Sequence, residues 1–201
     1  MKVLVLVKKK PLKTNAVRFL EQKKIPFTLA EYEVVENHLD AKSAAKGMGI
    51  SENTIFKTLV AVGNKTGPIV AVVPGDKELD LKKIAKVSGN KKVEMLPMKE
   101  LEPLTGYVHG GCSPVGMKKQ FPTFFAVEAE ELDIIRCSAG MRGLQIVINP
   151  NELIKLLTIV LGVMIGVLVI LCLIFLILKF KGRKPKDKKE KNSDKKTKTN
   201  S

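Results

Sequence analysis

The spacing of apolar and polar residues predicts three short helices in the first half of the chain. Thr14 is a suitable N-cap for a helix at 15–24, and Asp40 for an alanine-rich helix at 41–48. A third helix, with its apolar residues on one face, is expected to begin after Asp80. These helices are interleaved with strand candidates.

Apolar runs rich in β-branched residues predict the strands. The runs at 55–62 and 69–73 are separated by 63–68, a glycine- and proline-containing segment typical of a hairpin turn, so we place this hairpin at the centre of the sheet. Further strand candidates lie at 27–35, 123–127, 132–136 and 144–148, and the last two are joined by a turn predicted at 138–143. Because helices and strands alternate irregularly and no internal repeat is present, we expect an α+β domain with a mixed sheet.

The strongest hydrophobic signal is a run of 23 uncharged residues at 156–178, interrupted only by Thr158, Gly162 and Gly166. As a helix it would be about 35 Å long, which is enough to cross a bilayer core. The alternative is a buried core helix, but a soluble domain of this size rarely hides a helix that is apolar on every face. The sequence therefore predicts a membrane span. Its two glycines have the GxxxG spacing of helix–helix contacts and hint at dimerisation, with lipid-facing glycines as the alternative.

Charge distinguishes the end of the chain from the rest. The formal net charge is +15, which favours an acidic partner such as nucleic acid or an anionic membrane. Residues 179–201 contain 11 basic and 3 acidic residues, with no aromatic residue beyond Phe180, so we expect a disordered lysine-rich tail. At the other end, residues 1–10 place apolar residues before lysines, the wrong order for a secretory signal. The globular part is therefore expected to begin in the cytosol.

Cysteine and histidine are too few for common metal or disulfide frameworks. The chain has only Cys112, Cys137, Cys172, His38 and His109, with no CxxC pair. We therefore expect no zinc site and no disulfide scaffold.

Lys57 is the first candidate for chemistry. It shares its strand phase with apolar residues, so it is expected to reach an anion or a cleft, although a lysine on an edge strand is an equal alternative. The glycine-dense stretch at 105–116 could present main-chain N–H groups to a phosphate or a developing oxyanion, or could be an ordinary turn system. Cys112 with His109 suggests a thiol nucleophile, but no third orienting group is evident, so a structural or incidental cysteine is the preferred alternative.

Six motifs, in order and spacing, resemble the YbaK family: KTNA at 13–16, FKTL at 56–59, LDLKK at 79–83, TGYV at 105–108, GGCSPVGMKK at 110–119 and SAGMRGLQ at 138–145. Members of this family are free-standing relatives of the prolyl-tRNA synthetase editing domain and act as Cys-tRNA(Pro) deacylases. The resemblance covers about residues 11–157 and implies an α+β fold with a mixed, barrel-like sheet and flanking helices. It also implies tRNA as the substrate, a link to prolyl-tRNA synthetase, and no metal or other cofactor.

The resemblance also implies roles for individual residues. Lys57 matches the lysine that holds the 3′-terminal region of the tRNA. The loop that positions the aminoacyl ester and the pocket around it match Gly110, Gly111, Ser113, Pro114, Tyr32 and Ser138. In the family the substrate's own thiol attacks its ester and gives a cyclised product, so the protein supplies positioning and oxyanion stabilisation. Gln145 falls where some relatives carry an acidic residue, and Cys112 where relatives can carry an aliphatic one.

The expected organisation is an extension at 1–10, a deacylase domain at 11–155, a membrane helix at 156–178 and a basic tail at 179–201. The tail's charge favours a cytosolic C-terminus by the positive-inside rule, but a folded basic domain without an export signal should resist translocation. We therefore expect a single-pass protein of the cell membrane with its catalytic domain facing the cytoplasm. Two alternatives stay open: a non-catalytic tRNA-binding or regulatory module, and an editing enzyme of different amino-acid specificity. Cys-tRNA(Cys) is a further expected substrate.

Overall fold

The computed structural model describes residues 13–34, 41–158 and 170–171. The chain divides into two compact units, Met1–Leu161 and Gly162–Ser201. All but two of the described residues belong to the first unit, and the fold described below is that unit.

The described residues include the α-helices α1 (Asn15–Gln22), α2 (Ala41–Met48), α3 (Leu81–Val87) and α4 (Met98–Thr105), and a further helical segment at 150–158. The predicted caps of α1 and α3 are confirmed, because Thr14 Oγ1 accepts from Val17 N at 3.2 Å and Asp80 Oδ1 accepts from Lys82 N and Lys83 N at 2.9 Å each. The predicted cap of α2, Asp40, lies outside the described residues.

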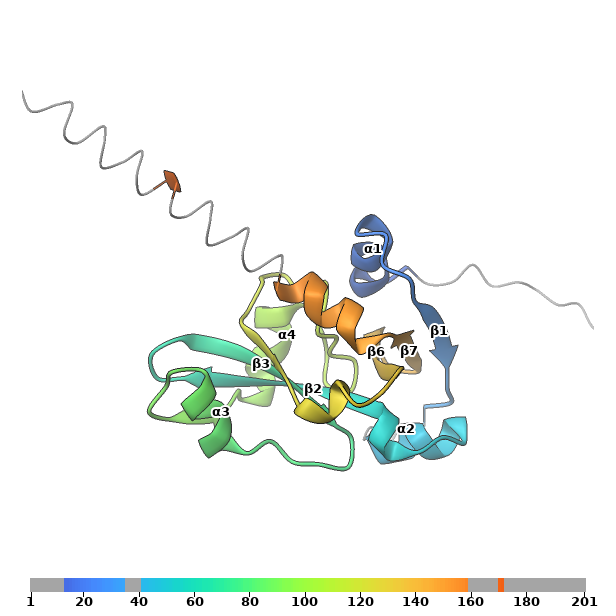
Figure 1. Cartoon of the computed structure of the whole chain (residues 1–201), viewed down its shortest axis with the longest axis horizontal. Helices are drawn as coiled ribbons and strands as arrows, with labels where there is room; N and C mark the ends of the chain where they lie inside the picture. The colour runs from blue at the N-terminus through green and yellow to red at the C-terminus, as the bar shows by residue number, and fades with distance from the viewer. Residues whose placement is uncertain (1–12, 35–40, 159–169, 172–201) are drawn as a thin grey trace, which may run out of the picture. The chain divides into compact units, whose positions relative to one another are not determined.

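Seven strands form one mixed sheet: β1 (Thr28–Glu31), β2 (Ile55–Gly63), β3 (Gly67–Pro74), β4 (Val93–Met95), β5 (Thr123–Phe125), β6 (Ile135–Met141) and β7 (Leu144–Ile148). Their order is β1-β7-β6-β2-β3-β5, and β4 pairs with β2. The β2–β6 and β3–β5 pairs are parallel and the others antiparallel. This confirms the α+β class and the central β2–β3 hairpin, which crosses the middle of the domain in Figure 1. Among the described strands the pairing is an open path with β1 and β5 at its ends, so the expected barrel-like closure is not observed.

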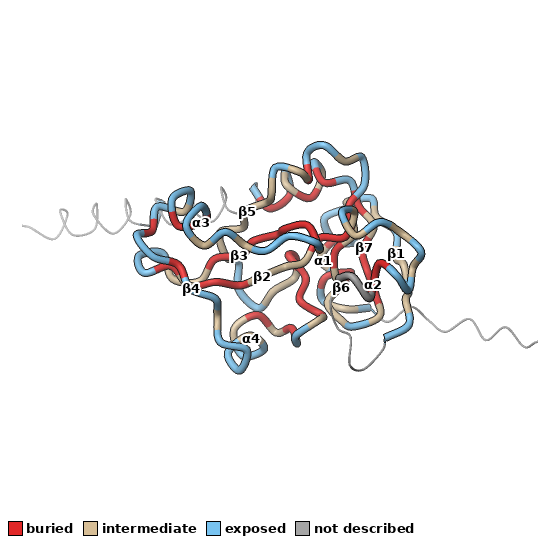
Figure 2. The backbone as a smooth tube through the Cα atoms, turned by 90° about the horizontal axis from the view of Figure 1, so that it is seen from below, coloured by how far each residue is buried: buried red, intermediate tan, exposed pale blue. Residues whose placement is uncertain are grey.

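The principal core includes buried residues of β2, β3, β6 and β7, and buried residues concentrate along these strands in Figure 2. The last six residues of β3 are all buried, as its continuous apolar run predicts. Such burial on both faces is expected of a strand at the centre of a sheet, which is where the hairpin lies. A smaller cluster joins α3 to β2, and another joins α2 to the start of β2.

Four predictions about local structure were wrong, one of them the strand expected at 132–136, which overlaps β6 only at 135 and 136. No element was expected at β4 or α4, where a three-residue strand is too short for a pattern and Pro103 within α4 argues against a helix. The segment expected as a turn at 138–143 is mostly strand, because β6 runs to Met141 through an irregularity in its pairing with β7. β1 is also shorter than its predicted range, and ends at Glu31.

The domain extends into the first residues of the predicted membrane span. Residues 150–158 are helical, and Asn149 Oδ1 caps this helix by accepting from Asn151 N at 2.9 Å. Leu156 and Leu157, which the sequence analysis assigned to the span, are buried in the core instead. Burying a leucine side chain contributes about 1.5–3 kcal/mol, which holds these residues in the domain.

In the ranges that the structure describes, no helix has both the length and the apolar character needed to cross a bilayer. Most of the predicted span, 159–169 and 172–178, lies outside those ranges. Beyond residues 156–158, the structure describes only Ile170 and Leu171 within this span, and both are helical and exposed.

Candidate functional site

A cavity of about 650 Å³ follows the first two-thirds of β2. It forms where one edge of this strand has no neighbour. β6 pairs with Ile55 and Phe56, and β4 pairs only from Ala61 onward. Residues 57–60 therefore have a strand partner on the β3 side but none on the other side within the described residues. An open strand edge exposes main-chain polar groups to a ligand, so this gap is the natural candidate for a binding site.

Within the described part of the chain, two buried side-chain atoms of residues that line this cavity have no hydrogen-bond partner: Thr58 Oγ1 and Gln145 Oε1. Gln145 is only 4% exposed. An unpaired buried polar atom costs about 1–3 kcal/mol, so native proteins rarely keep one without a reason. Both atoms can hydrogen-bond to a ligand that enters the cavity.

The main chain of Thr58 adds to this polar surface. Leu96 N donates to Val60 O at 3.0 Å, so the main-chain groups of Val60 point away from β3, toward the side of β2 on which the gap lies. In an antiparallel strand residues two apart direct their main-chain groups to the same side, so those of Thr58 face the gap as well. The cavity thus meets both the side chain and the backbone of Thr58.

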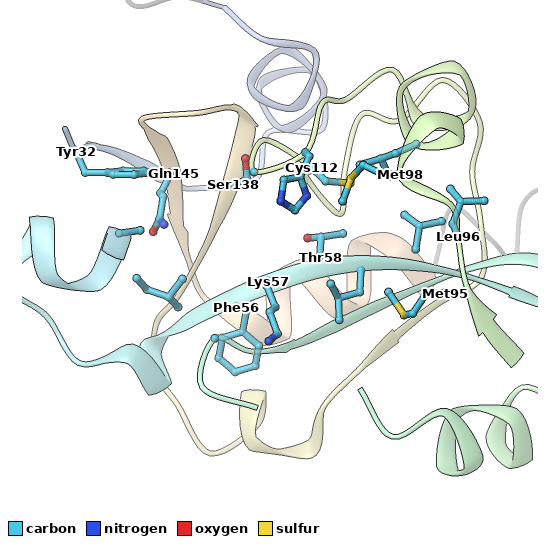
Figure 3. A pocket seen from close by; sticks show the side chains of 18 residues that line it. Tyr32, Phe56, Lys57, Thr58, Met95, Leu96, Met98, Cys112, Ser138 and Gln145 are labelled. Carbon is cyan, nitrogen blue, oxygen red and sulfur yellow. The ribbon is translucent and has the colours of Figure 1, made fainter. Parts of the chain in front are cut away.

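Lys57 and Thr58 leave β2 on opposite sides, as neighbours in a strand must, and both still border the cavity because the strand edge is open (Figure 3). Lys57 Nζ forms an ion pair with Glu78 Oε1 at 3.1 Å. The Lys57 side chain is 25% exposed, but that of Glu78 is 94% exposed, so the pair gains little in stability and can exchange for another anion. The structure therefore places Lys57 at the border of the cavity, with its ammonium group held by an exposed carboxylate.

The other predicted site residues fall into two groups. Tyr32, Gly110 and Ser138 line the cavity with Lys57, whereas Gly111, Ser113 and Pro114 are buried beside it and are absent from its lining. Tyr32 follows directly after β1, held by a hydrogen bond from its N to Gly143 O at 3.0 Å. Ser138 lies where the β6–β7 pairing becomes irregular, and its Oγ accepts from Gly140 N at 3.2 Å.

The two adjacent glycines of the loop have different tasks. Gly110 adopts φ of +75°, a conformation that favours glycine, and lines the cavity. Gly111 N donates to Val108 O at 3.0 Å, so its N–H is already used. A Cβ on Gly111 would lie 3.1 Å from Met141 Cα, which explains why the close approach of the loop to β6 requires glycine. Only Gly110 of this pair offers an N–H without an acceptor among the described residues.

Ser113 and Pro114 shape the loop from inside the core. Ser113 is completely buried, and its Oγ accepts from Val115 N at 3.5 Å. Tyr107 fixes the other side of the loop, because its hydroxyl donates to Val115 O at 2.8 Å. These contacts make the glycine-dense stretch a rigid support for the cavity.

Cys112 lines the cavity but is poorly suited to act as a nucleophile. Burial raises the pKa of its thiol to about 12, so the thiol is neutral near pH 7. The nucleophilic form is the thiolate, and the structure therefore favours a packing role for Cys112 over the thiol nucleophile considered from sequence.

The described residues contain no group of three or more His, Cys, Asp or Glu side chains arranged to hold a metal ion. The side chains that line the cavity change in character along its length, from polar to apolar. Tyr32, Ser138 and Gln145 lie at one end in Figure 3 and Met95 and Met98 at the other, with Thr58 between them.

Sequence reasoning missed Thr58 and the residues of β4, α4 and the segment between them that line the far end, namely Met95, Leu96, Met98 and Leu101. No signal marked the second group, because neither element was predicted. Thr58 could have been found by asking which polar residues share the core-facing phase of β2, since it alternates with the buried Phe56 and Val60.

Comparisons with known proteins agree with this architecture. A family model described as aminoacyl-tRNA editing domain matches residues 35–156. A protein of Enterococcus faecalis (strain ATCC 700802 / V583), EbsC, whose name assigns it as a Cys-tRNA(Pro)/Cys-tRNA(Cys) deacylase, is 58% identical over 149 residues, which are 74% of this chain and 91% of that protein. The proline–tRNA ligase of Thermodesulfovibrio yellowstonii (strain ATCC 51303 / DSM 11347 / YP87) is 29% identical over 89 residues, which are 44% of this chain and 15% of the ligase.

Among solved structures, one described as a trans-editing enzyme for prolyl tRNA synthetase superposes with a TM-score of 0.66 at 26% identity, and the match covers 75% of this chain and 94% of the other. The family match includes the whole of β2, the glycine-dense loop and the β6–β7 pair that form the cavity. Because this match extends over well more than half of the sequence and a relative at 58% identity is spanned almost completely, the chain belongs to the aminoacyl-tRNA editing domain family.

Proposed function

We propose that this protein is an aminoacyl-tRNA deacylase that clears Cys-tRNA(Pro), and also Cys-tRNA(Cys), by cleaving the ester between cysteine and the tRNA. The observation that carries the proposal is the cavity at the open edge of β2, with the unpaired atoms Thr58 Oγ1 and Gln145 Oε1 in its wall. The relative at 58% identity, whose name assigns it this activity, supports the same substrates.

In the proposed reaction the thiol of the substrate cysteine attacks its own ester carbon. A carbon–sulfur bond forms, the carbon–oxygen bond to the ribose breaks, and the thiol proton passes to the departing ribose oxygen. The products are a cyclic thiolactone and a tRNA with a free hydroxyl. The protein then needs no nucleophile of its own, which agrees with the neutral thiol of Cys112.

The residues of the cavity have distinct proposed tasks. Gln145 Oε1 accepts from the α-ammonium of the cysteinyl group, and the Thr58 hydroxyl hydrogen-bonds to the polar atoms of the ester. The N–H of Gly110 stabilises the negative charge that develops on the ester oxygen. Lys57 exchanges Glu78 for the terminal phosphate of the tRNA, and Tyr32 and Ser138 complete the wall around the amino acid.

The test is deacylation of Cys-tRNA(Pro) by the full chain, measured as loss of the cysteine label from the tRNA. The variant Lys57→Ala is expected to lose at least about a hundredfold in kcat/KM, because a charged contact to the substrate is removed. Lys77→Ala is a matched control, since Lys77 forms a similar exposed ion pair, with Glu128, outside the cavity. Glu78→Gln is expected to keep full activity, because it only frees Lys57.

Two results would overturn the proposal. Tight binding of the charged tRNA without release of cysteine would identify a binding module. Release of alanine or serine as fast as cysteine would exclude the thiol-assisted reaction and indicate a different specificity.

We also propose that the apolar run anchors the protein in the cell membrane with its catalytic domain facing the cytoplasm. Residues 159–178, which follow the last core helix, still number 20, the length of a spanning helix. We expect the full chain to stay with membranes after alkaline carbonate washing and a chain ending at Thr158 to be released. Release of both would contradict the anchor.

We also propose two contacts with other protein chains. Gly162 and Gly166 pair two copies of the helix, so Gly162→Leu should reduce cross-linked dimers in membranes. Prolyl-tRNA synthetase is the proposed partner that supplies mischarged tRNA, supported by the sequence similarity to a proline–tRNA ligase. Co-purification of the two proteins in the presence of tRNA tests this association.

A further inference from the structure

We propose that Met95 and Met98 form a subsite for the purine ring of the adenosine that carries the aminoacyl ester. This inference rests on the proposed function and adds to it a residue-level assignment of the tRNA end. Both methionines line the cavity, yet they are 44% and 60% exposed, among the most exposed large apolar side chains of the domain.

The two ends of the cavity differ in how much room and solvent they offer. Tyr32, which lies beside Gln145 in Figure 3, packs with Ala44 and Ile55, which also line the cavity and are nearly completely buried. At the opposite end Met95 and Met98 reach solvent (Figure 3). A tRNA must leave the cavity through an open end, whereas a single amino acid fits an enclosed one. The nucleoside next to the ester therefore lies at the methionine end.

The backbone that carries the methionines is firmly held. Leu96 N donates to Val60 O at 3.0 Å, which ties the end of β4 to β2. Pro97 precedes α4, and its O accepts from Glu100 N at 2.9 Å, which fixes the first turn of the helix. Met95 and Met98 thus present flexible side chains on an ordered support.

The chemistry of the surface suits a purine. Methionine side chains are polarisable and adapt to flat aromatic surfaces, and thioethers contact aromatic rings favourably. Base stacking does not require hydrogen bonds from the protein, so an apolar surface can bind the terminal base of a tRNA. Leu96 and Leu101 line the same end and extend the apolar surface behind the methionines.

The direct test is an NMR titration of the full chain labelled at the methionine methyl groups with adenosine 5′-monophosphate as the probe. The signals of Met95 and Met98, assigned with Met95→Ala and Met98→Ala, are expected to shift through the ring current of adenine. Ribose 5-phosphate, which has the phosphate and sugar but no base, should leave them in place. Unmoved signals at millimolar nucleotide, or equal shifts with ribose 5-phosphate, would overturn the subsite.

Kinetics give a second, independent test. Met98→Ala is expected to raise KM for Cys-tRNA(Pro) about threefold to tenfold and to leave kcat unchanged, while release of ethanol from cysteine ethyl ester, which has no base, should proceed as in the unaltered protein. Val127→Ala is the matched control, because Val127 is also 60% exposed but lies outside the cavity. An unchanged KM would overturn the subsite. The titration needs no turnover, so it separates failure of this inference from failure of the deacylase proposal, which would appear as no cysteine release by the unaltered protein.

Discussion

The two ends of the cavity reduce the stability of the free protein in opposite ways, one by burying a polar atom and the other by exposing apolar side chains. At the enclosed end, around Gln145, a polar atom is buried without a partner. At the open end, Met95 and Met98 leave apolar surface in water. Each feature costs stability in the free protein, and each is removed when a ligand of the right chemistry fills that end.

The difference indicates what each end recognises. Unpaired buried acceptors select strictly, because a ligand that lacks the matching donor leaves the cost in place. Exposed methionines select loosely, since any flat apolar group can cover them. A deacylase needs this division, because it must discriminate between amino acids but holds a terminal adenosine that is the same in every tRNA.

Among the variants that test the difference between the two ends, Gln145→Leu is expected to have the largest effect. Removal of a hydrogen bond to a charged group costs about 1.5–3 kcal/mol, so kcat/KM for Cys-tRNA(Pro) should fall about tenfold to a hundredfold. The free energy of unfolding should rise by about 1 kcal/mol, because an unpaired buried acceptor disappears. Chemical denaturation and cysteine release measure the two effects.

A substrate without the amino group sharpens this test. With 3-mercaptopropionyl-tRNA(Pro), which lacks the α-ammonium, wild type and Gln145→Leu should be equally active. Gln145→Glu keeps an acceptor and should retain more activity on the cysteinyl substrate than Gln145→Leu does. An equal loss by Gln145→Leu on both substrates would show that Gln145 only supports the fold.

Thr58→Val should have a smaller effect of the same kind. Valine has nearly the shape of threonine but no hydroxyl, so it removes the unpaired Oγ1 without leaving a cavity. We expect kcat/KM to fall about threefold to tenfold, as for a neutral hydrogen bond, and the free energy of unfolding to stay equal or rise. Thr58→Ser restores the hydroxyl and should recover the activity. Loss of stability in Thr58→Val would mean that the hydroxyl is already satisfied in the free protein.

The smallest expected effect is that of Cys112→Ala on activity, below about twofold, because the reacting thiol belongs to the substrate. The pKa of the Cys112 thiol is raised to about 12, so its thiolate stays rare at pH 9, where an ordinary cysteine thiol is half ionised. Peptide mass spectrometry should therefore find slow alkylation of Cys112 by iodoacetamide between pH 7 and pH 9 in the folded protein. Rapid alkylation in that range would return Cys112 to the list of nucleophile candidates.

The same raised pKa has a consequence for folding. Burial disfavours the charged thiolates of Cys112 and Cys137 and raises the pKa of both thiols to about 12. In the unfolded chain the pKa of these thiols is near 9.0, so the folded state favours their neutral forms. Their contribution is complete below about pH 9 and is lost as the pH rises toward 12, so urea denaturation should show stability declining across that interval.

Much of the fold followed from local pattern. Thr14 and Asp80 are caps in the structure as in the sequence, and the two long apolar runs form the central hairpin. β4 and α4 could not be predicted, because a three-residue strand has no measurable period and Pro103 obscures the helix. The pairing of β4 with β2 is a tertiary contact, and it places Met95 at the open end of the cavity.

The candidate site divides in the same way. Lys57 and Gly110 were recognisable from strand phase, glycine density and family motifs, and both line the cavity. Gly111, Ser113 and Pro114 were predicted alongside them, but they support the loop from within the core. A motif match does not distinguish residues that contact a ligand from residues that hold a loop in place, because either task can demand one particular residue type.

The sequence by itself determined the α+β class, the central hairpin, the family and the residue types that the site uses, because these depend on local periodicity and on motifs fixed along the chain. Only the tertiary structure decided where β2 lacks a neighbour, since that gap depends on how far β6 and β4 each pair along it. The same pairing decided that Thr58 and Gln145, distant in sequence, share one cavity with unpaired atoms. Strand pairing is a long-range choice, and a cavity is the space that such choices leave unfilled.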